Sequence, residues 1–93
     1  MIASFRDKGL SELFEDGKTA KIEKAMHTRI IRRLDALDRA RNPIDMRVPG
    51  FDFHPLHGFD PPRYSVHVNG PWCITFEFDG ENAAKVDLEN YHH

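Results

Sequence analysis

The sequence predicts a two-layer α+β domain in which an antiparallel β-sheet packs on a short and a long N-terminal helix. Residues 19–41 contain no Gly or Pro and carry one apolar stripe, while the second half holds three segments of alternating apolar and polar residues. A helix with one apolar stripe and a sheet with one apolar face should pack on each other, leaving the second sheet face open. Because 93 residues supply one core, we expect a single domain over residues 1–93.

The first half should contain a strand and both helices. Residues 1–5 are mostly apolar, which suits an opening strand, and the apolar spacing of residues 10–14 predicts a short helix that ends at Gly17. The long helix is expected from Thr19 to Arg41, because Pro43 in the sequence RNP stops it. Its apolar face steps by four and three residues through Ile22, Met26, Ile30, Leu34 and Leu37.

The second half should form an antiparallel meander that begins near Phe51. Its alternating segments are residues 63–68, 72–78 and 83–88, separated by the turn sequences NGP and DGEN. A three-residue loop over NGP keeps like faces together by pairing Val68 with Trp72, Val66 with Ile74 and Tyr64 with Phe76. This register leaves His67 directly across from Cys73 on the polar face.

Composition and charge narrow the functional classes. Hydrophobic residues make up 40% of the chain and charged residues 30%, as in ordinary folded proteins, and the net charge of −2 argues against strong general affinity for nucleic acid. Residues 51–93 hold seven acidic residues, two basic residues and five of the six histidines, so chemistry there would depend on imidazole. With one cysteine and no stretch resembling a transmembrane helix or a signal peptide, we expect a cytoplasmic protein without membrane contact.

Four stretches together resemble one protein family. They are the opening MIASFRDKGLSELFEDG, HPLHG at 54–58, YSVHVNGPW at 64–72 and YH at 91–92. With the order of the expected elements, they make the chain similar to the HigB branch of the RelE/ParE toxin superfamily over nearly its whole length. The resemblance implies a RelE-like fold and a bacterial toxin of a type II toxin–antitoxin module.

The resemblance also implies partners and a chemistry. Most HigB-like toxins cleave mRNA in the ribosomal A site, so the expected partners are the 70S ribosome, mRNA and a small HigA-like helix-turn-helix antitoxin, with operator DNA contacted only through the antitoxin. The family reaction is independent of metal and cofactor. A ribose 2′-oxygen attacks the adjacent phosphate and displaces the 5′-oxygen of the next nucleotide, which requires a proton acceptor, a proton donor and stabilisation of the phosphate charge.

The family motifs assign candidate site residues one at a time. His54 matches the active-site histidine of the HPL stretch, and Tyr91 and His92 match the terminal tyrosine and histidine, so these three are candidates for proton transfer and base stacking. Two further positions depart from the pattern. His57 stands where most relatives have lysine, and Asn90 stands where they have aspartate.

The third departure is Cys73, which stands where the family usually has a phosphate-binding arginine. A guanidinium is permanently charged and grips phosphate with several donors, whereas a neutral thiol is a weak donor. Reduced or altered ribonuclease activity is the simplest expectation. Arg63, His67 and Asn90 are the candidate substrate-binding residues, because Arg63 could reach in from the strand edge and protonated histidines could replace part of the missing charge.

Three alternatives stay open at this point. Cys73 opposite His67 has the residue types of a thiolate–imidazole pair, although no acyl-enzyme motif surrounds it. His54, His57, Cys73, His92 and His93 have the ligand types of a zinc site, but the HPLH spacing is a weak metal signal, so we expect no metal site. Finally, the chain could be a catalytically weak relative that acts mainly by binding its antitoxin.

Overall fold

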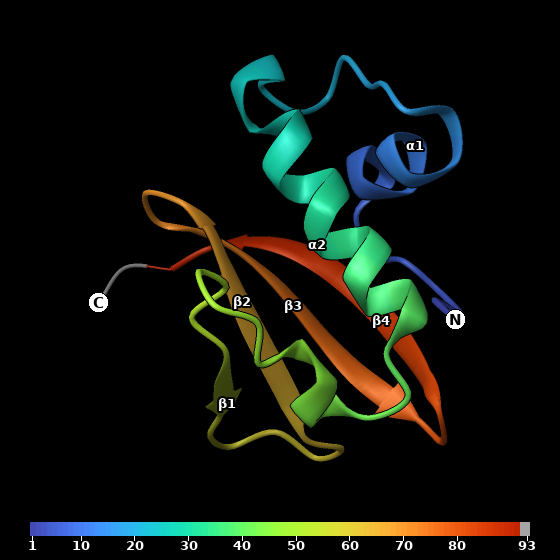
Figure 1. The fold of residues 1–93 in the computed structure, drawn as a ribbon, viewed down its shortest axis with the longest axis vertical. Coiled ribbons are helices and arrows are strands. Elements are labelled where there is room, and N and C mark those ends of the chain that lie inside the picture. The colour runs from blue at the N-terminus through green and yellow to red at the C-terminus, as the bar shows by residue number, and fades with distance from the viewer. Residues whose placement is uncertain (92–93) are drawn as a thin grey trace.

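The computed structural model describes residues 1–91, which form a layer of helices on one face of a four-stranded antiparallel sheet (Figure 1). The strands are β1 (His54–Leu56), β2 (Arg63–Asn69), β3 (Trp72–Asp79) and β4 (Asn82–Asn90), and they lie in the order of the sequence. The predicted α+β class and two-layer arrangement are confirmed. Within the described residues, no helix is long and apolar enough to span a membrane.

The short helix α1 (Lys8–Asp16) begins and ends at the residues that its sequence requires. The Asp7 carboxylate accepts a hydrogen bond from the Leu10 N–H and caps the first turn. Gly17 follows the last turn with φ of 77°, a left-handed conformation that glycine adopts without steric cost, and its N–H donates to the Leu13 carbonyl. The predicted end of this helix is therefore confirmed.

The long helix begins later than predicted. A short 3₁₀ turn, η1 (Lys24–Met26), leads into α2 (His27–Arg39), so the prediction of helix from Thr19 was wrong at the N-terminal end. The reason is the Glu12 carboxylate of α1, which accepts hydrogen bonds from the Thr19 hydroxyl at 2.6 Å and the Lys21 ammonium at 3.0 Å and holds this segment against α1 instead.

The predicted apolar stripe is buried although its first two members, Ile22 and Met26, lie before α2. A Cβ placed on Gly9 would lie 2.8 Å from Ile22 Cγ1, which shows how closely Ile22 packs on α1. The remaining stripe residues join residues from the sheet in one hydrophobic core. Burying each large aliphatic side chain contributes about 1.5–3 kcal/mol to folding, so this contact between the layers is the main stabilising feature.

The opening segment forms isolated bridges and not the predicted strand. Ile2 pairs with Ala83 and Phe5 with Val86 in a parallel arrangement along β4. The Ala3 N–H donates to the Ala83 carbonyl at 2.7 Å, and the Val86 N–H donates to the Ser4 carbonyl at 3.1 Å. The segment leaves this edge at once to enter α1, so the pairing stays too short to count as a strand.

The sheet has the predicted register except at its hairpin loop. Tyr64 pairs with Phe76, Val66 with Ile74 and His67 with Cys73, as alternation required. The predicted pairing of Val68 with Trp72 was wrong, because a bulge after His67 places Asn69 opposite Trp72. A short helical turn, η2 (Pro43–Met46), connects α2 to the segment before β1.

The second sheet face carries no helix, but it is less open than expected. Thr75 is fully buried and Glu77 is only 8% exposed. The Arg63 side chain lies across this face and donates hydrogen bonds to Glu77 Oε2 at 3.0 Å and Thr75 Oγ1 at 3.1 Å. The polar face therefore divides into a part covered by Arg63 and a part near the hairpin loop that is hollowed.

Candidate functional site

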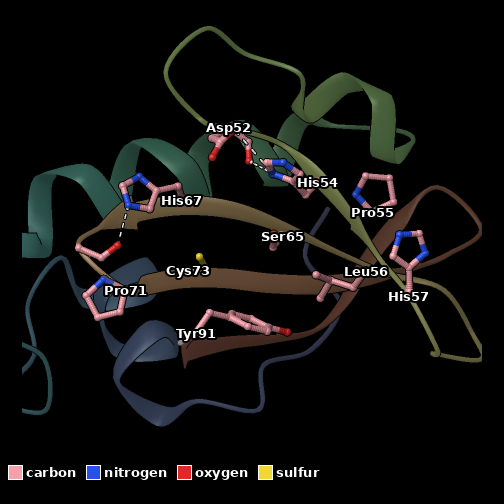
Figure 2. Close-up of a pocket in the computed structure, with 11 residues that line it drawn as sticks. Asp52, His54, Pro55, Leu56, His57, Ser65, His67, Pro71, Cys73 and Tyr91 are labelled. Atoms are coloured by element: carbon pink, nitrogen blue, oxygen red, sulfur yellow. Dashed lines mark hydrogen bonds and ion pairs between the residues drawn. The ribbon is translucent and has the colours of Figure 1, made fainter. Parts of the chain in front are cut away.

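A pocket of about 370 Å³ occupies the polar face of the sheet, between β1 with the residues before it and the β2–β3 hairpin loop (Figure 2). We call it the histidine pocket. Its lining residues are Asp52, His54, Pro55, Leu56, His57, Ser65, His67, Gly70, Pro71, Cys73 and Tyr91. No lysine or arginine belongs to this lining in the described part of the chain, so the cations that the lining itself can supply are protonated histidines.

The structure brings together five of the predicted site residues. His54, His57, His67, Cys73 and Tyr91 come from β1 and the residue after it, from β2, from β3 and from the residue after β4. They lie around one cavity although they are far apart in the sequence, because the antiparallel meander places β1, β2, β3 and β4 side by side. His92, also predicted, lies outside the described residues.

His54 is held in one tautomer by the backbone. Its Nδ1 lies 2.9 Å from the Asp52 carbonyl oxygen, which can only accept a hydrogen bond, so Nδ1 carries the proton. The neutral ring then has an acceptor at Nε2, which is the requirement for a group that takes a proton from a substrate hydroxyl. The Asp52 carboxylate lies 3.6 Å from Nδ1 and would stabilise the charged ring after that transfer.

His67 has the opposite tautomer for the same reason. Its Nε2 lies 2.9 Å from the Gly70 carbonyl oxygen in the hairpin loop, so Nε2 donates and Nδ1 is the acceptor of the neutral ring. This bond ties the imidazole to the loop that also contributes Pro71 to the pocket. His67 is therefore a partly buried wall of the pocket with a fixed orientation.

Cys73 is a neutral thiol in this setting. Burial raises the pKa of the Cys73 thiol, and the negative charges of Asp52 and Glu89 raise it further. A thiolate nucleophile needs the opposite, a lowered pKa beside a cation. The Cys73–His67 pair therefore lacks the electrostatics of nucleophilic catalysis, even though the two residues are direct partners in the ladder.

Tyr91 is tied to the rest of the sheet at both its backbone and its side chain. Its N–H donates to the Pro71 carbonyl at 2.8 Å, which fastens the residue after β4 to the hairpin loop. Burial raises the pKa of the Tyr91 hydroxyl, and so do the charge of Glu89 and the hydrogen bond that the hydroxyl donates to this carboxylate. The hydroxyl therefore stays protonated at neutral pH and can act as a hydrogen-bond donor.

A chain of hydrogen bonds connects Tyr91 to Arg63. The Thr75 hydroxyl donates to Glu89 Oε2 at 2.6 Å and accepts from Arg63 Nη2 at 3.1 Å, while Glu89 accepts from Tyr91. Such a network orients its members because each lost bond would leave a buried polar group unsatisfied. The hydrogen bond to Glu89 thus fixes the position of the Tyr91 hydroxyl.

Two predicted substrate-binding residues lie outside the pocket lining. The Arg63 side chain is 4% exposed and forms an ion pair with Glu77 at 3.0 Å, so its charge is compensated within the sheet. Asn90 pairs with Trp72 and, by strand alternation, lies on the opposite face from Glu89. The roles predicted for these two residues stay predictions, and the geometry gives Arg63 a structural function.

The sequence contained weaker signals for three site residues that the motifs did not identify. Asp52 stands two residues before His54 and adopts φ of 49°, which is uncommon for a residue other than glycine. Ser65 lines the pocket and Glu89 supports it, and both follow from the strand alternation that places them beside His67 and Cys73.

In residues 1–91, no three His, Cys, Asp or Glu side chains are grouped to hold a metal ion.

The chain matches a known protein family and named relatives. The family described as "RelE-like toxin of type II toxin-antitoxin system HigB" matches residues 3–92. The chain is 37% identical to Endoribonuclease HigB of Proteus vulgaris over 92 residues, which cover 99% of this chain and 100% of the relative. It is 31% identical to Toxin HigB-1 of Vibrio cholerae over 80 residues, which cover 84% of each chain.

These matches extend over nearly the whole chain and include the strands that form the pocket. The resemblance inferred from the four sequence stretches is confirmed. A toxin of a type II system has an antitoxin as its partner. The chain therefore belongs to the HigB family of RelE-like toxins from type II toxin–antitoxin systems.

Proposed function

We propose that this toxin is an endoribonuclease that cleaves mRNA on the ribosome and carries out the cut in the histidine pocket. The observation that supports this most directly is His54, which lines the pocket with Nδ1 committed to the Asp52 carbonyl. The name of the Proteus vulgaris relative, an endoribonuclease, gives the reaction class. The cytoplasm is the compartment in which such a reaction would occur.

The proposed reaction uses one histidine for each proton transfer. His54 Nε2 takes the proton of a ribose 2′-hydroxyl, and the resulting oxygen attacks the adjacent phosphorus. The bond to the 5′-oxygen of the next nucleotide breaks, leaving a 2′,3′-cyclic phosphate on one fragment. His92, assigned from the family motif, returns a proton to the departing 5′-oxygen. Tyr91 contacts the substrate with its ring or its protonated hydroxyl.

The proposed partners are a HigA-like helix-turn-helix antitoxin, the 70S ribosome and mRNA. Dependence on the ribosome suits a pocket that has few cations of its own, because positioning of the mRNA would then come from the ribosome. Operator DNA would be contacted only through the antitoxin. These assignments rest on the family and are tested together with the activity.

A second candidate function is binding of the antitoxin without cleavage of RNA. The observation that favours it is the lining of the pocket, in which Cys73 replaces the usual arginine and Asp52 adds a negative charge. A positioned guanidinium contributes about 3–4 kcal/mol to some transition states by analogy with other electrostatic donors. A pocket without it would bind a phosphate weakly.

Induced expression without the antitoxin distinguishes the two functions. We expect growth arrest and new mRNA 5′ ends inside translated codons, both lost in His54→Ala, His92→Ala and Tyr91→Ala. The matched control is His27→Gln, which changes the histidine outside the pocket whose ring contacts the Ile22 carbonyl. Normal growth and intact transcripts, with folded and abundant protein, would reject the endonuclease and support the binding function.

A further inference from the structure

A second pocket, of about 280 Å³, lies at the edge of β2 and contains three arginines of α2. Arg29, Arg32 and Arg33 line it together with Gly50, Phe51 and the shared residue His67. We call it the arginine pocket. It lies beyond the N-terminal end of β1, which pairs only with residues 63–65 of β2, and beside the segment that precedes β1.

Two of the three arginines, Arg29 and Arg33, are held by neutral groups. Arg33, which is 7% exposed, donates from Nε to the His67 carbonyl at 2.6 Å, from Nη1 to the Arg29 carbonyl at 3.0 Å and from Nη2 to the Gly50 carbonyl at 3.3 Å. Its guanidinium also lies 4.6 Å from the centre of the Phe51 ring. Arg29 donates to the Val68 carbonyl at 3.3 Å. Carbonyl oxygens orient these groups but do not cancel their charge.

No carboxylate compensates the arginine pocket. Among residues 1–91, none of the three arginines takes part in an ion pair with Asp or Glu. Burial and the neighbouring charges of Arg32 and Arg29 lower the pKa of Arg33. Three uncompensated guanidiniums repel one another, and an anion bound between them would relieve that repulsion. Guanidinium groups also match phosphate oxygens in geometry and donor number.

The position of the arginine pocket indicates which anion it binds. His67 lines both pockets, and its carbonyl oxygen is the partner of Arg33 Nε. A strand of RNA in the histidine pocket would reach the arginines by crossing the edge of β2 beside this residue. We propose that the arginine pocket binds a backbone phosphate of the same RNA strand whose scissile phosphate occupies the histidine pocket. This inference rests on the proposed endonuclease function.

The site would supply the positive charge that the histidine pocket lacks. A second phosphate, held at a fixed distance along the strand, positions the scissile one without contacting it. The arginine pocket therefore acts on substrate binding, while Cys73 remains a variant position at the reaction centre.

The test measures binding of a short 2′-O-methyl RNA, which cannot be cleaved because its 2′-oxygen is blocked. Arg29→Gln with Arg32→Gln removes two exposed charges and leaves the buried Arg33 in place. Arg39→Gln with Arg41→Gln is the matched control, since it removes two exposed charges outside the pocket. Affinity is measured by fluorescence anisotropy over a range of salt concentrations.

We expect the pocket variant to bind roughly tenfold more weakly at low salt, with a salt dependence reduced by about 0.7 per lost phosphate contact. A series of RNAs, each with one neutral methylphosphonate linkage, identifies the phosphate. One linkage should weaken binding to the wild type and the control variant but not to the Arg29/Arg32 variant. Equal losses in both variants, or no such linkage, would overturn the proposal.

Two further outcomes separate the partners and the functions. If the Arg29/Arg32 variant loses antitoxin binding but keeps wild-type RNA binding, the pocket serves the antitoxin and the proposal fails. If mRNA is cleaved in cells but no linkage distinguishes the variants, the endonuclease stands and only the arginine pocket proposal falls. If the linkage effect is present but the wild type cuts no mRNA, the phosphate site stands without the catalytic function.

Discussion

Cys73 lies in the histidine pocket with His67 opposite it and the carboxylates of Asp52 and Glu89 nearby. Strand alternation alone predicted its face and its partner. Its chemistry depends on the surrounding charges, which come from residues far away in the sequence. Those charges and its burial favour the neutral thiol, so the residue provides a small, weakly polar surface where the family usually presents a guanidinium.

Removal of the thiol tests this view of Cys73. We expect Cys73→Ala to change the rate of mRNA cleavage by less than about threefold, because a neutral thiol contributes at most one weak hydrogen bond. The measurement is the rate of appearance of cleaved mRNA in a translating extract, with His54→Ala as the inactive reference. Loss of activity in Cys73→Ala would instead show that the thiol takes part in the reaction.

Restoring the family residue tests the missing charge. Cys73→Arg places a cation in a pocket whose lining contains no lysine or arginine among the described residues. We expect cleavage to increase by tenfold or more, which corresponds to about 1.4 kcal/mol of transition-state stabilisation. Cys73→Gln is the neutral control of similar reach. An unchanged or lower rate would show that the histidines already hold the phosphate, or that Glu89 captures the new guanidinium.

At the scale of the elements, Arg63 joins three strands. From β2 it reaches Thr75 and Glu77 on β3 and the Lys85 carbonyl on β4. The sequence placed Arg63 on the polar face, but not its direction along that face, because alternation fixes the side of a sheet and not the rotamer. In the structure this side chain is part of the frame that supports Glu89 and Tyr91, and its contact with the substrate stays a prediction.

Removing the hydrogen bonds of Arg63 should mainly lower the stability of the fold. We expect Arg63→Gln to lower the free energy of unfolding by about 3 kcal/mol or more, since it leaves the buried Glu77 carboxylate with only the longer ion pair to the exposed Lys85. Urea denaturation measures the loss. Lys85→Gln, which removes an exposed partner of Glu77 at 3.7 Å, should cost less than about 1 kcal/mol. A stable Arg63→Gln protein that cannot bind RNA would assign Arg63 to the substrate.

At the scale of the whole molecule, the N-terminal segment meets the sheet along β4, where Phe5 pairs with Val86 next to Asp87. Burial raises the pKa of Asp87, and the hydrogen bond from the Leu88 N–H opposes this only in part. A raised pKa in the folded state means that the ionised carboxylate destabilises the fold. The penalty is complete above the folded-state pKa and disappears as the pH falls below the ordinary value of an aspartate.

Asp87→Asn should therefore stabilise the protein in a pH-dependent way. The amide oxygen can keep the hydrogen bond from Leu88 while the charge is removed. We expect a higher melting temperature at pH 7, with about 1 kcal/mol corresponding to roughly 4–8 °C for a domain of this size. The difference from wild type should shrink as the pH falls through the folded-state pKa of Asp87. A difference that is constant with pH would refute the electrostatic cause.

Apolar periodicity and the family motifs predicted different parts of this structure. Periodicity predicted the two layers and most of the strand register, because the spacing of apolar residues shows which face of each helix or strand is buried. It failed where Glu12 holds Thr19 and at the bulge after His67, because local contacts and bulges leave no trace in the spacing of apolar residues. The family motifs located His54 and Tyr91. They could not identify Asp52, Glu89 or the uncompensated arginines, whose significance lies in distances between residues and not in their order.

The edges of the sheet show how this protein avoids unwanted partners. An unpaired strand edge is a template on which another chain can add a strand. Beyond β1, the His67 N–H donates to the Phe51 carbonyl, and the carbonyls of His67 and Val68 accept from Arg33 and Arg29. At the other side, β4 is covered by the bridges of Ile2 and Phe5. These contacts occupy part of each edge, so they hinder the addition of a strand from a second copy at these positions.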